Sequence, residues 1–339
     1  MSTMPLAQIH GRNQCRVDRV PRPTAGPDDV IIKVQLCGIC GSDLAYIRGG
    51  GLLGPGQAMP IGHELVGTVF ELGKNVRHLQ RGQRVVVNPE GAGNCIGNGG
   101  PEGGFAPYLR VRNVAADRAA VITLPASLSP EQGAMVEPLS VAMHAVHQGG
   151  VLASDKAVIF GAGPVGLGIL LVLKYYGLSN IVVSDLSERR LAVAQSLGAK
   201  VHRGTSDVAA FLSQQHGVAE IAGLGPMPAT DIFFEATGAA AVFTQITQLA
   251  QRGARAVVVG VHQSPVELDL VNVLMRELRI VGAMAYPTEF PQVISMLESG
   301  SVDISPLITQ RYPLSRFDQA IARASDTETA IKVMVDCQV

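Results

Sequence analysis

The segment AVIFGAGPVGLGILLVLKYYG, residues 157–177, decides the fold of this chain. A short apolar run precedes the glycines and a longer apolar run follows them, which predicts a strand, a turn and then a helix. The first glycine of GAGPVG permits a tight turn, the second lets a pyrophosphate approach the backbone, and the third lets helix and strand pack closely. The helix N-terminus then faces the phosphates. The pattern predicts a dinucleotide site that includes Gly161, Gly163, Pro164, Val165 and Gly166.

An acidic residue follows at the spacing that this fingerprint requires. Asp185 lies 19 residues after Gly166 and ends the strand-like segment IVVSD. Its carboxylate can accept hydrogen bonds from the adenosine ribose and would repel a 2′-phosphate, so NAD is favoured over NADP. Arg189 and Arg190 follow closely and leave NADP open as an alternative.

Strand and helix patterns alternate around this segment. Because the strands read as continuous apolar runs, the alternation predicts a parallel sheet covered on both faces, that is, a doubly wound α/β domain. The expected strands are 156–160, 180–184, 231–235, 254–259 and 278–284, and the expected helices are 164–176, 188–197 and 242–250.

The first third of the chain has a different character. Strand-like segments at 29–36, 65–72 and 83–87 are separated by Gly and Pro every few residues, which is typical of a barrel-like all-β unit. Residues 91–104 contain seven glycines and predict a loop. Ser129-Pro-Glu-Gln132 predicts a capped helix start, with a second helix at 138–147. A further helix is expected at 289–298, and the strand-like tail 330–336 is expected to return to the first domain.

Composition excludes several classes of function. The chain has 339 residues and a net charge of −1. It therefore lacks the positive electrostatic field that attracts nucleic acids or anionic membranes. Trp is absent, which argues against base stacking. The longest apolar stretch, 157–173, is interrupted by glycines and is short for a membrane span. Five cysteines are too few for a disulfide framework, and no signal-peptide pattern opens the chain, so we expect a cytoplasmic protein with a small-molecule partner.

A thiol, an imidazole and carboxylates occur in three short segments that could meet. Cys40 and Ser42 lie just after a predicted strand, His63 and Glu64 are adjacent, and Glu137 precedes the dinucleotide domain. This mixture of donors suits zinc, and a catalytic zinc needs one open position. Taken singly, each residue is more often structural. A redox pair of Cys37 and Cys40 is a further alternative, although no thioredoxin-like pattern surrounds it.

Read together, the motifs resemble the zinc-dependent alcohol dehydrogenases of the medium-chain dehydrogenase/reductase superfamily. The matching segments are CGICGSD (37–43), GHE (62–64), EPLSV (137–141), GAGPVG (161–166) and RYPLSRFDQAI (311–321). Polyol dehydrogenases such as the sorbitol, xylitol and L-idonate enzymes are the most similar. The resemblance implies a GroES-like β-barrel catalytic domain (1–138 and 285–339), a Rossmann NAD-binding domain (139–284) and a homodimer or homotetramer.

The resemblance also implies roles for single residues. Cys40, His63 and Glu64 would surround a catalytic zinc, with Glu137 as a fourth ligand or as the partner of a metal-bound water. Ser42 would pass on the alcohol proton, and Asp43 would orient His63. On the cofactor side, the implied contacts are Gly161, Gly163, Gly166, Asp185 and Arg190, with Val259, Val261 and Met284 beside the nicotinamide.

Two departures from the family pattern change the expectation. Family members commonly bind a structural zinc through four cysteines, whereas residues 88–104 here contain a single cysteine, Cys95. Because one thiolate cannot build a tetrahedral sulfur site, we expect one catalytic zinc per chain and no structural zinc. Ala45 and Ala285 stand where polyol enzymes carry His and Arg, which favours a less hydroxylated substrate. Tyr46, Met59 and Tyr286 would then line an apolar cleft.

The leading hypothesis is NAD-linked oxidation of a secondary alcohol (a polyol, a diol or a cyclic alcohol) to a ketone. The alternatives are a threonine- or butanediol-type dehydrogenase, a zinc-free quinone or enone reductase of the same fold, and a non-enzymatic NAD-binding protein. The remaining histidines are interpreted as packing, interface or ordinary surface and loop residues: His78, His144, His147, His202, His216 and His262.

Overall fold

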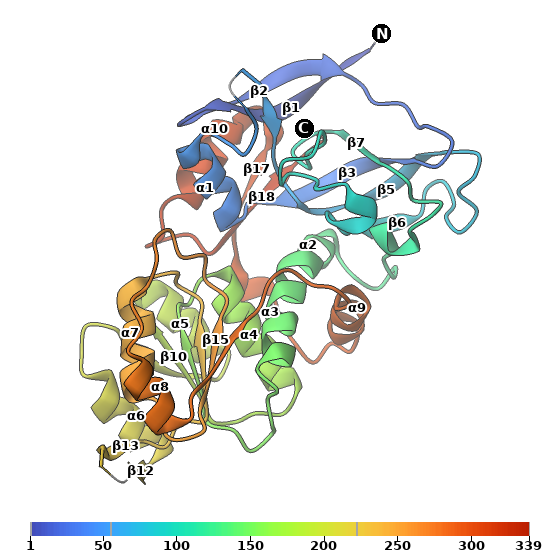
Figure 1. The fold of residues 1–339 in the computed structure, drawn as a ribbon. Helices are drawn as coiled ribbons and strands as arrows, with labels where there is room; N and C mark the ends of the chain where they lie inside the picture. The colour runs from blue at the N-terminus through green and yellow to red at the C-terminus, as the bar shows by residue number, and fades with distance from the viewer. Residues whose placement is uncertain (1, 55, 222, 339) are drawn as a thin grey trace. The chain divides into compact units, whose positions relative to one another are not determined.

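The structure is a computed structural model that describes residues 2–54, 56–221 and 223–338. The chain forms two compact units, which Figure 1 shows as ribbons. One unit consists of Met1–Glu137 together with Phe290–Val339, and the other consists of Pro138–Glu289. No helix in the described ranges has both the length and the apolar character needed to cross a lipid bilayer.

The second unit contains the predicted parallel sheet. Its six strands have the order β11-β10-β9-β14-β15-β16, and every neighbouring pair is parallel. The order reverses between β9 and β14, as in a Rossmann sheet. The strands are β9 (Ala157–Phe160), β10 (Ile181–Asp185), β11 (Lys200–Arg203), β14 (Ile232–Glu235), β15 (Arg255–Val258) and β16 (Arg279–Gly282).

Helices connect these strands, as the alternating pattern predicts. They are α4 (Pro164–Tyr175), α5 (Glu188–Ser196), α6 (Val208–His216), α7 (Ala240–Leu249) and α8 (Leu270–Arg276). Strand β11, helices α6 and α8, and the antiparallel hairpin β12 (Val218–Ile221) and β13 (Gly225–Pro228) were not predicted. They are short and carry mixed polar and apolar residues, so their periodicity is weak.

The first unit is built from two sheets. A three-stranded sheet has the order β2-β1-β4, and a seven-stranded sheet has the order β17-β18-β3-β5-β6-β8 with β7 also paired to β3. The strands are β1 (Thr3–Gly11), β2 (Gln14–Pro21), β3 (Val30–Gly38), β4 (Met59–Pro60), β5 (Glu64–Leu72), β6 (Arg84–Val87), β7 (Tyr108–Val111), β8 (Val121–Thr123), β17 (Ile308–Pro313) and β18 (Lys332–Asp336).

Three helices begin close to the predicted positions: α2 (Pro130–Ala134), α3 (Val136–Gln148), whose start belongs to this unit, and α9 (Phe290–Glu298). Helices α1 (Gly41–Gly49) and α10 (Phe317–Ala324) were not predicted. The capping box predicted at Ser129 is confirmed: Gln132 N donates to Ser129 Oγ at 3.1 Å and Ser129 N donates to Gln132 Oε1 at 2.8 Å.

The tail returns to the first unit, as predicted. Strand β18 pairs antiparallel with β3, so that Met334 lies opposite Gly38, and β3 pairs on its other side with β5, so that Gly38 also lies opposite Glu64. Three distant parts of the chain therefore meet at the end of β3. This register places Cys40, two residues after Gly38, near His63 and Glu64.

The glycine-rich loop at 88–104 is ordered by polar contacts. The Asn94 side chain donates to Gly91 O at 2.7 Å and accepts from Arg112 N at 2.9 Å. Glu102 pairs with the Arg112 guanidinium at 3.0 Å. These contacts fix the loop to the neighbouring sheet residues, and the expectation that it carries no structural zinc stays a prediction.

Candidate metal centre and nucleotide site

Three of the predicted metal ligands come together in the first unit. One ligand atom from each of Cys40, His63 and Glu64 can be chosen so that all three lie within 4.8 Å of one another. Cys40 is the N-cap of α1, directly after β3, and Glu64 opens β5 with His63 just before it. The antiparallel pairing of β3 with β5 brings the two segments to the same sheet edge.

Asp43 joins the two loops that carry these residues. Its side chain is fully buried, and it accepts hydrogen bonds from Cys40 N at 2.9 Å and from Gly62 N at 3.1 Å. Asp43 Oδ1 also lies 3.6 Å from His63 Nδ1. Burial raises the pKa of Asp43, and the nearby His63 opposes that effect. Asp43 is therefore placed to hold the His63 ring while bracing both loops.

The opposite side of the imidazole faces Ser42. Ser42 Oγ lies 3.5 Å from His63 Nε2. Burial lowers the pKa of His63, but the Asp43 carboxylate and the Cys40 sulfur outweigh it, so the pKa lies well above the usual value. The site thus favours positive charge at the imidazole.

A buried lysine that the sequence analysis missed completes this charge cluster. Lys332 Nζ donates to both carboxylate oxygens of Glu64, at 2.6 and 2.5 Å, and to Ile39 O at 3.1 Å. Burial lowers the pKa of Lys332, but the charges of Glu64 and Cys40 outweigh that effect, so the pKa lies above its usual value. A signal was available: Lys332 is the only charged residue within the apolar run AIKVMV (330–335), and a lone charge in a central strand requires a buried partner.

The other predicted residues of the first unit have different surroundings. Glu137 is buried, and its charge helps to raise the pKa of His63. Tyr46 is half-buried, and its hydroxyl donates to Asn98 Oδ1 at 3.4 Å. Met59 packs in the core, and its sulfur accepts a hydrogen bond from Leu52 N at 3.2 Å. In the second unit, Tyr286 is buried.

These residues fit a zinc ion. Thiolate, imidazole and carboxylate are all zinc donors, and the site already gathers one of each. His63 Nδ1 is buried and lacks a hydrogen-bond partner among the described residues, with Asp43 just beyond bonding distance. A small shift of the ring would let Asp43 accept from Nδ1 and leave Nε2 to bind a metal, the arrangement that most ligating histidines adopt.

The dinucleotide fingerprint has the predicted geometry. Gly161 follows β9 with φ of +99°, which only glycine adopts easily. A Cβ at Gly166 would lie 1.8 Å from Gly161 O, so the third glycine allows α4 to approach the turn. A Cβ at Gly163 would meet only the Arg190 guanidinium, at 3.8 Å. Gly163 therefore offers open backbone beside a cation, as a pyrophosphate requires.

Asp185 connects this turn to the end of β10. It accepts hydrogen bonds from Ala162 N at 2.5 Å and from Ser187 N at 2.8 Å. Each carboxylate oxygen keeps a further lone pair for a ribose hydroxyl. At the other end of the predicted cofactor site, Val259 is half-buried, whereas Val261 and Met284 are 74% and 83% exposed.

Two histidines, His202 in β11 and His216 in α6, do not have the surface or loop positions expected of them, whereas His262 lies in a loop as expected. His202 and His216 are buried, with His202 Nδ1 3.0 Å from Ser184 Oγ and His216 Nδ1 2.8 Å from Thr230 Oγ1. His262 donates from Nε2 to the buried Glu235 at 3.0 Å. Polar partners far away in the sequence decide these placements, and a single-residue pattern does not show them.

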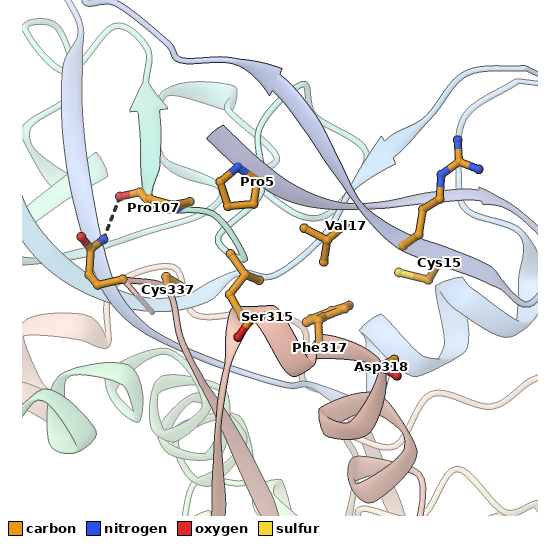
Figure 2. Close-up of a pocket in the computed structure, with 11 residues that line it drawn as sticks. Pro5, Cys15, Val17, Pro107, Ser315, Phe317, Asp318 and Cys337 are labelled. Atoms are coloured by element: carbon orange, nitrogen blue, oxygen red, sulfur yellow. Dashed lines mark hydrogen bonds between the residues drawn. The ribbon is translucent and has the colours of Figure 1, made fainter. Parts of the chain in front are cut away.

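The first unit also contains a pocket of about 660 Å³, away from the predicted site residues. Figure 2 shows Cys15 and Val17 of β2 on one side and Phe317 and Cys337 on the other. Burial raises the pKa of Cys15 to about 12, so its thiol is protonated and a poor nucleophile at neutral pH. None of the predicted catalytic, metal or cofactor residues lines this pocket.

Comparison with known proteins identifies the family. Residues 26–122 match the alcohol dehydrogenase GroES-like domain, and residues 164–299 match the zinc-binding dehydrogenase family. The chain is 35% identical to mouse sorbitol dehydrogenase over 97% of its own length and 94% of the relative's. The chain belongs to the zinc-dependent alcohol dehydrogenases of the medium-chain dehydrogenase/reductase superfamily.

Solved structures of alcohol dehydrogenases share the whole fold. 2R,3R-butanediol dehydrogenase from Bacillus subtilis is 31% identical, with a TM-score of 0.87 over 98% of this chain and 99% of that chain. An alcohol dehydrogenase from Escherichia coli CFT073, solved with NADH, is 25% identical, with a TM-score of 0.87 over 99% and 100% of the two chains. The predicted GroES-like and Rossmann fold of an NAD-linked, zinc-dependent alcohol dehydrogenase is confirmed.

Proposed function

We propose that this chain oxidises a polyol, a diol or a cyclic secondary alcohol to a ketone, with NAD as the hydride acceptor and one zinc per chain. The observation that carries the proposal is the gathering of Cys40, His63 and Glu64 ligand atoms within 4.8 Å. A zinc-free reductase of the same fold would not need these three donors together. The dinucleotide fingerprint and Asp185 supply the cofactor side.

The residues of the first unit would share the work as follows. Cys40, His63 and Glu64 would hold the metal, and Glu137 would serve as a fourth ligand or hold water beside it. When bound, zinc supplies Lewis acidity to the alcohol oxygen, and NAD supplies the hydride acceptor. Ser42 Oγ would accept the alcohol proton and pass its own hydroxyl proton on towards solvent, and Asp43 would keep the His63 ring in place.

The residues of the second unit would bind the cofactor. Gly161, Gly163 and the first turn of α4, with Pro164 and Val165, would hold the pyrophosphate, with Arg190 beside it. Asp185 would bind the adenosine ribose, which supports NAD over NADP. Val259, Val261 and Met284 would line the nicotinamide. We assign residues 139–284 to the cofactor domain. Residues 1–138 and 285–339 form the catalytic domain in this assignment.

The substrate class follows from relatives and from two alanines. Relatives named for sorbitol and for butanediol cover nearly the whole chain, so polyols and diols are the first substrates to test. Ala45 and Ala285 offer no hydrogen bonds to hydroxyl groups, which supports a less hydroxylated alcohol. Tyr46, Met59 and Tyr286 would provide apolar surface around it.

The deciding experiment is a panel of polyols, vicinal diols and cyclic alcohols with NAD, followed through NADH absorbance. We expect a vicinal diol or a cyclic alcohol to give a higher kcat/KM than sorbitol. The metal content of the purified chain, measured by mass spectrometry, should be one zinc per chain. A chain that holds no zinc, or that reduces quinones or enones without metal, would contradict the proposal.

We further propose that the chain is a cytoplasmic homodimer or homotetramer. Helix α8 and the edge strand β16 carry exposed apolar side chains, including Leu270 and Leu274 at 70% and 74% exposure. Exposed apolar residues on neighbouring elements of a soluble fold commonly mark a protein interface. An edge strand is also an open template for pairing.

A further inference from the structure

A buried carboxylate lies at the end of strand β14. Glu235 is fully buried, and its Oε1 accepts from Thr237 N at 2.8 Å and from Gly238 N at 3.0 Å. The Thr237 hydroxyl donates to the same oxygen. The other oxygen, Oε2, accepts from His262 Nε2 at 3.0 Å. Glu235 therefore joins the loop after β14 to the loop after β15.

The two loops pack closely against each other. Val259 N and Gly260 N donate to the Glu235 carbonyl oxygen at 2.9 and 2.8 Å. A Cβ at Gly260 would lie 2.2 Å from Gly238 N and 2.7 Å from Glu235 Oε2, so only glycine fits there. The backbone at 259–261 is thus held at a fixed distance from the Glu235 carboxylate.

This junction lies under the cofactor edge of the sheet. The strand order reverses between β9 and β14, and ligands of doubly wound sheets bind outside the carboxyl ends of such strands. Glu235 is the last residue of β14, and a Cβ at Gly161 of the fingerprint turn would lie 3.0 Å from Ala236 O. The Glu235 loop therefore separates the pyrophosphate turn from the loop at 259–261.

His262 supplies the second half of the junction. Its side chain is 16% exposed, and its ring lies edge-on to Phe243, with the centroids 6.2 Å apart. Within the described part of the chain, His262 is the only basic side chain paired with Glu235. A buried carboxylate without such a donor is costly, so the pair fixes the position of the segment that carries His262.

We propose that Glu235 and His262 are a positioning pair that holds residues 259–261 in place for the nicotinamide and thereby sets NADH affinity. The inference rests on the proposed placement of the nicotinamide beside Val259 and Val261. The residues proposed for the adenosine half, Asp185 and the fingerprint glycines, lie on other loops. Loss of the pair should therefore weaken binding of the nicotinamide half alone.

The test compares two ligands that share the adenosine half. Dissociation constants for NADH and for AMP are measured by calorimetry on the wild-type chain and on His262→Leu. Because a hydrogen bond to a buried carboxylate is lost, we expect the NADH constant to rise about 10-fold, while the AMP constant stays within about twofold. The variant His262→Gln keeps an N–H donor, so its NADH dissociation constant should rise only about threefold.

A second histidine of the same unit, at the end of helix α6, provides a control. His216 is more deeply buried than His262, and it pairs with Thr230, next to the opposite end of β14. His216→Leu should lower thermal stability and leave the NADH and AMP constants unchanged. If His262→Leu does not fold, the NADH-to-AMP ratio in His262→Gln and Glu235→Gln decides instead.

Each outcome separates the two proposals. An unchanged NADH constant in the pair variants, or an equal loss of NADH and AMP binding, would overturn the positioning role. If the wild-type chain binds NADH no more tightly than AMP, the nicotinamide half adds no affinity, and the proposed cofactor placement would be overturned instead.

Discussion

Lys332 and Glu64 form a fully enclosed ion pair beside the candidate metal ligands. Both side chains are 1% exposed, and Nζ lies 2.6 and 2.5 Å from the two carboxylate oxygens. Glu64 is therefore shared: the same carboxylate that could bind a metal neutralises a lysine that has no access to water. The charge of Lys332 is part of the site, although the residue lies in strand β18, far from Glu64 in the sequence.

Replacing one member of this pair should destabilise the protein. Lys332→Met leaves the Glu64 charge buried without its partner, and we expect a loss of about 3–5 kcal/mol in the free energy of unfolding, measured by urea denaturation. The double variant Lys332→Met/Glu64→Gln removes both charges and should recover much of that loss. A single variant as stable as the wild type would show that the pair is not a structural requirement.

Asp43→Asn should weaken zinc binding without changing the ligands. Asparagine keeps the shape of Asp43 but loses the negative charge beside His63, so zinc affinity should fall about 10–100-fold. Competition with a chromogenic chelator measures the change. Asp18→Asn is the control, because Asp18 lies on strand β2 of the same unit and pairs with two basic side chains, His10 and Arg16. Equal zinc affinity in Asp43→Asn and wild type would refute the orienting role.

Asp185→Ala should reduce the preference for NAD. With the carboxylate gone, the ribose diol loses its acceptor and a 2′-phosphate loses its repulsion, so the NAD-to-NADP ratio of kcat/KM should fall at least about 10-fold. Asp207→Ala is the matched control, since Asp207 caps α6 in the same unit. The control should lose stability but keep the ratio.

His216 should make the fold sensitive to mild acid. Burial, helped by the charge of Lys156, lowers the pKa of His216 to about 4, whereas an unfolded histidine titrates near 6.5. The unfolded chain then binds more protons below about pH 6.5, so stability falls as the pH drops from there towards 4, by about 2 kcal/mol. His216→Asn should flatten this part of the stability curve, measured by denaturation at a series of pH values; an unchanged curve would exclude His216 as the cause.

Leu274→Asp should dissociate the proposed assembly. A charge on the exposed face of α8 would have to be buried in an interface, which is unfavourable. Light scattering should give the mass of a single chain for the variant and a multiple of 35.6 kDa for the wild type. Leu152→Asp, at an exposed leucine outside α8 and β16, should keep the wild-type mass.

Local patterns predicted the long elements and the motif residues. The fingerprint at Gly161–Gly166 and the capping box at Ser129 depend on neighbours in the sequence, and both have the expected geometry. Glu64 shows the limit of this reasoning. The sequence indicated that Glu64 is a metal ligand. Its partner Lys332 is brought next to it by the pairing of β18 with β3, which no local pattern specifies.

The same holds for Glu235 and His262. Glu235 reads as the polar end of a buried strand, and His262 reads as a loop residue. Their hydrogen bond depends on β14 and β15 being neighbours in the sheet. Contacts of this kind follow from sheet order, whereas element type follows from composition and periodicity.

The position of Lys332 also bears on how the protein is made. Glu64 and Lys332 are separated by 268 residues, and the whole of the second unit is translated between them. During synthesis on the ribosome, Glu64 therefore has no countercharge until the second unit and strand β18 have been translated. A ribosome that stalls between the second unit and strand β18, or a protease that removes β18, would leave a chain whose cofactor sheet is complete while its metal-binding half is not.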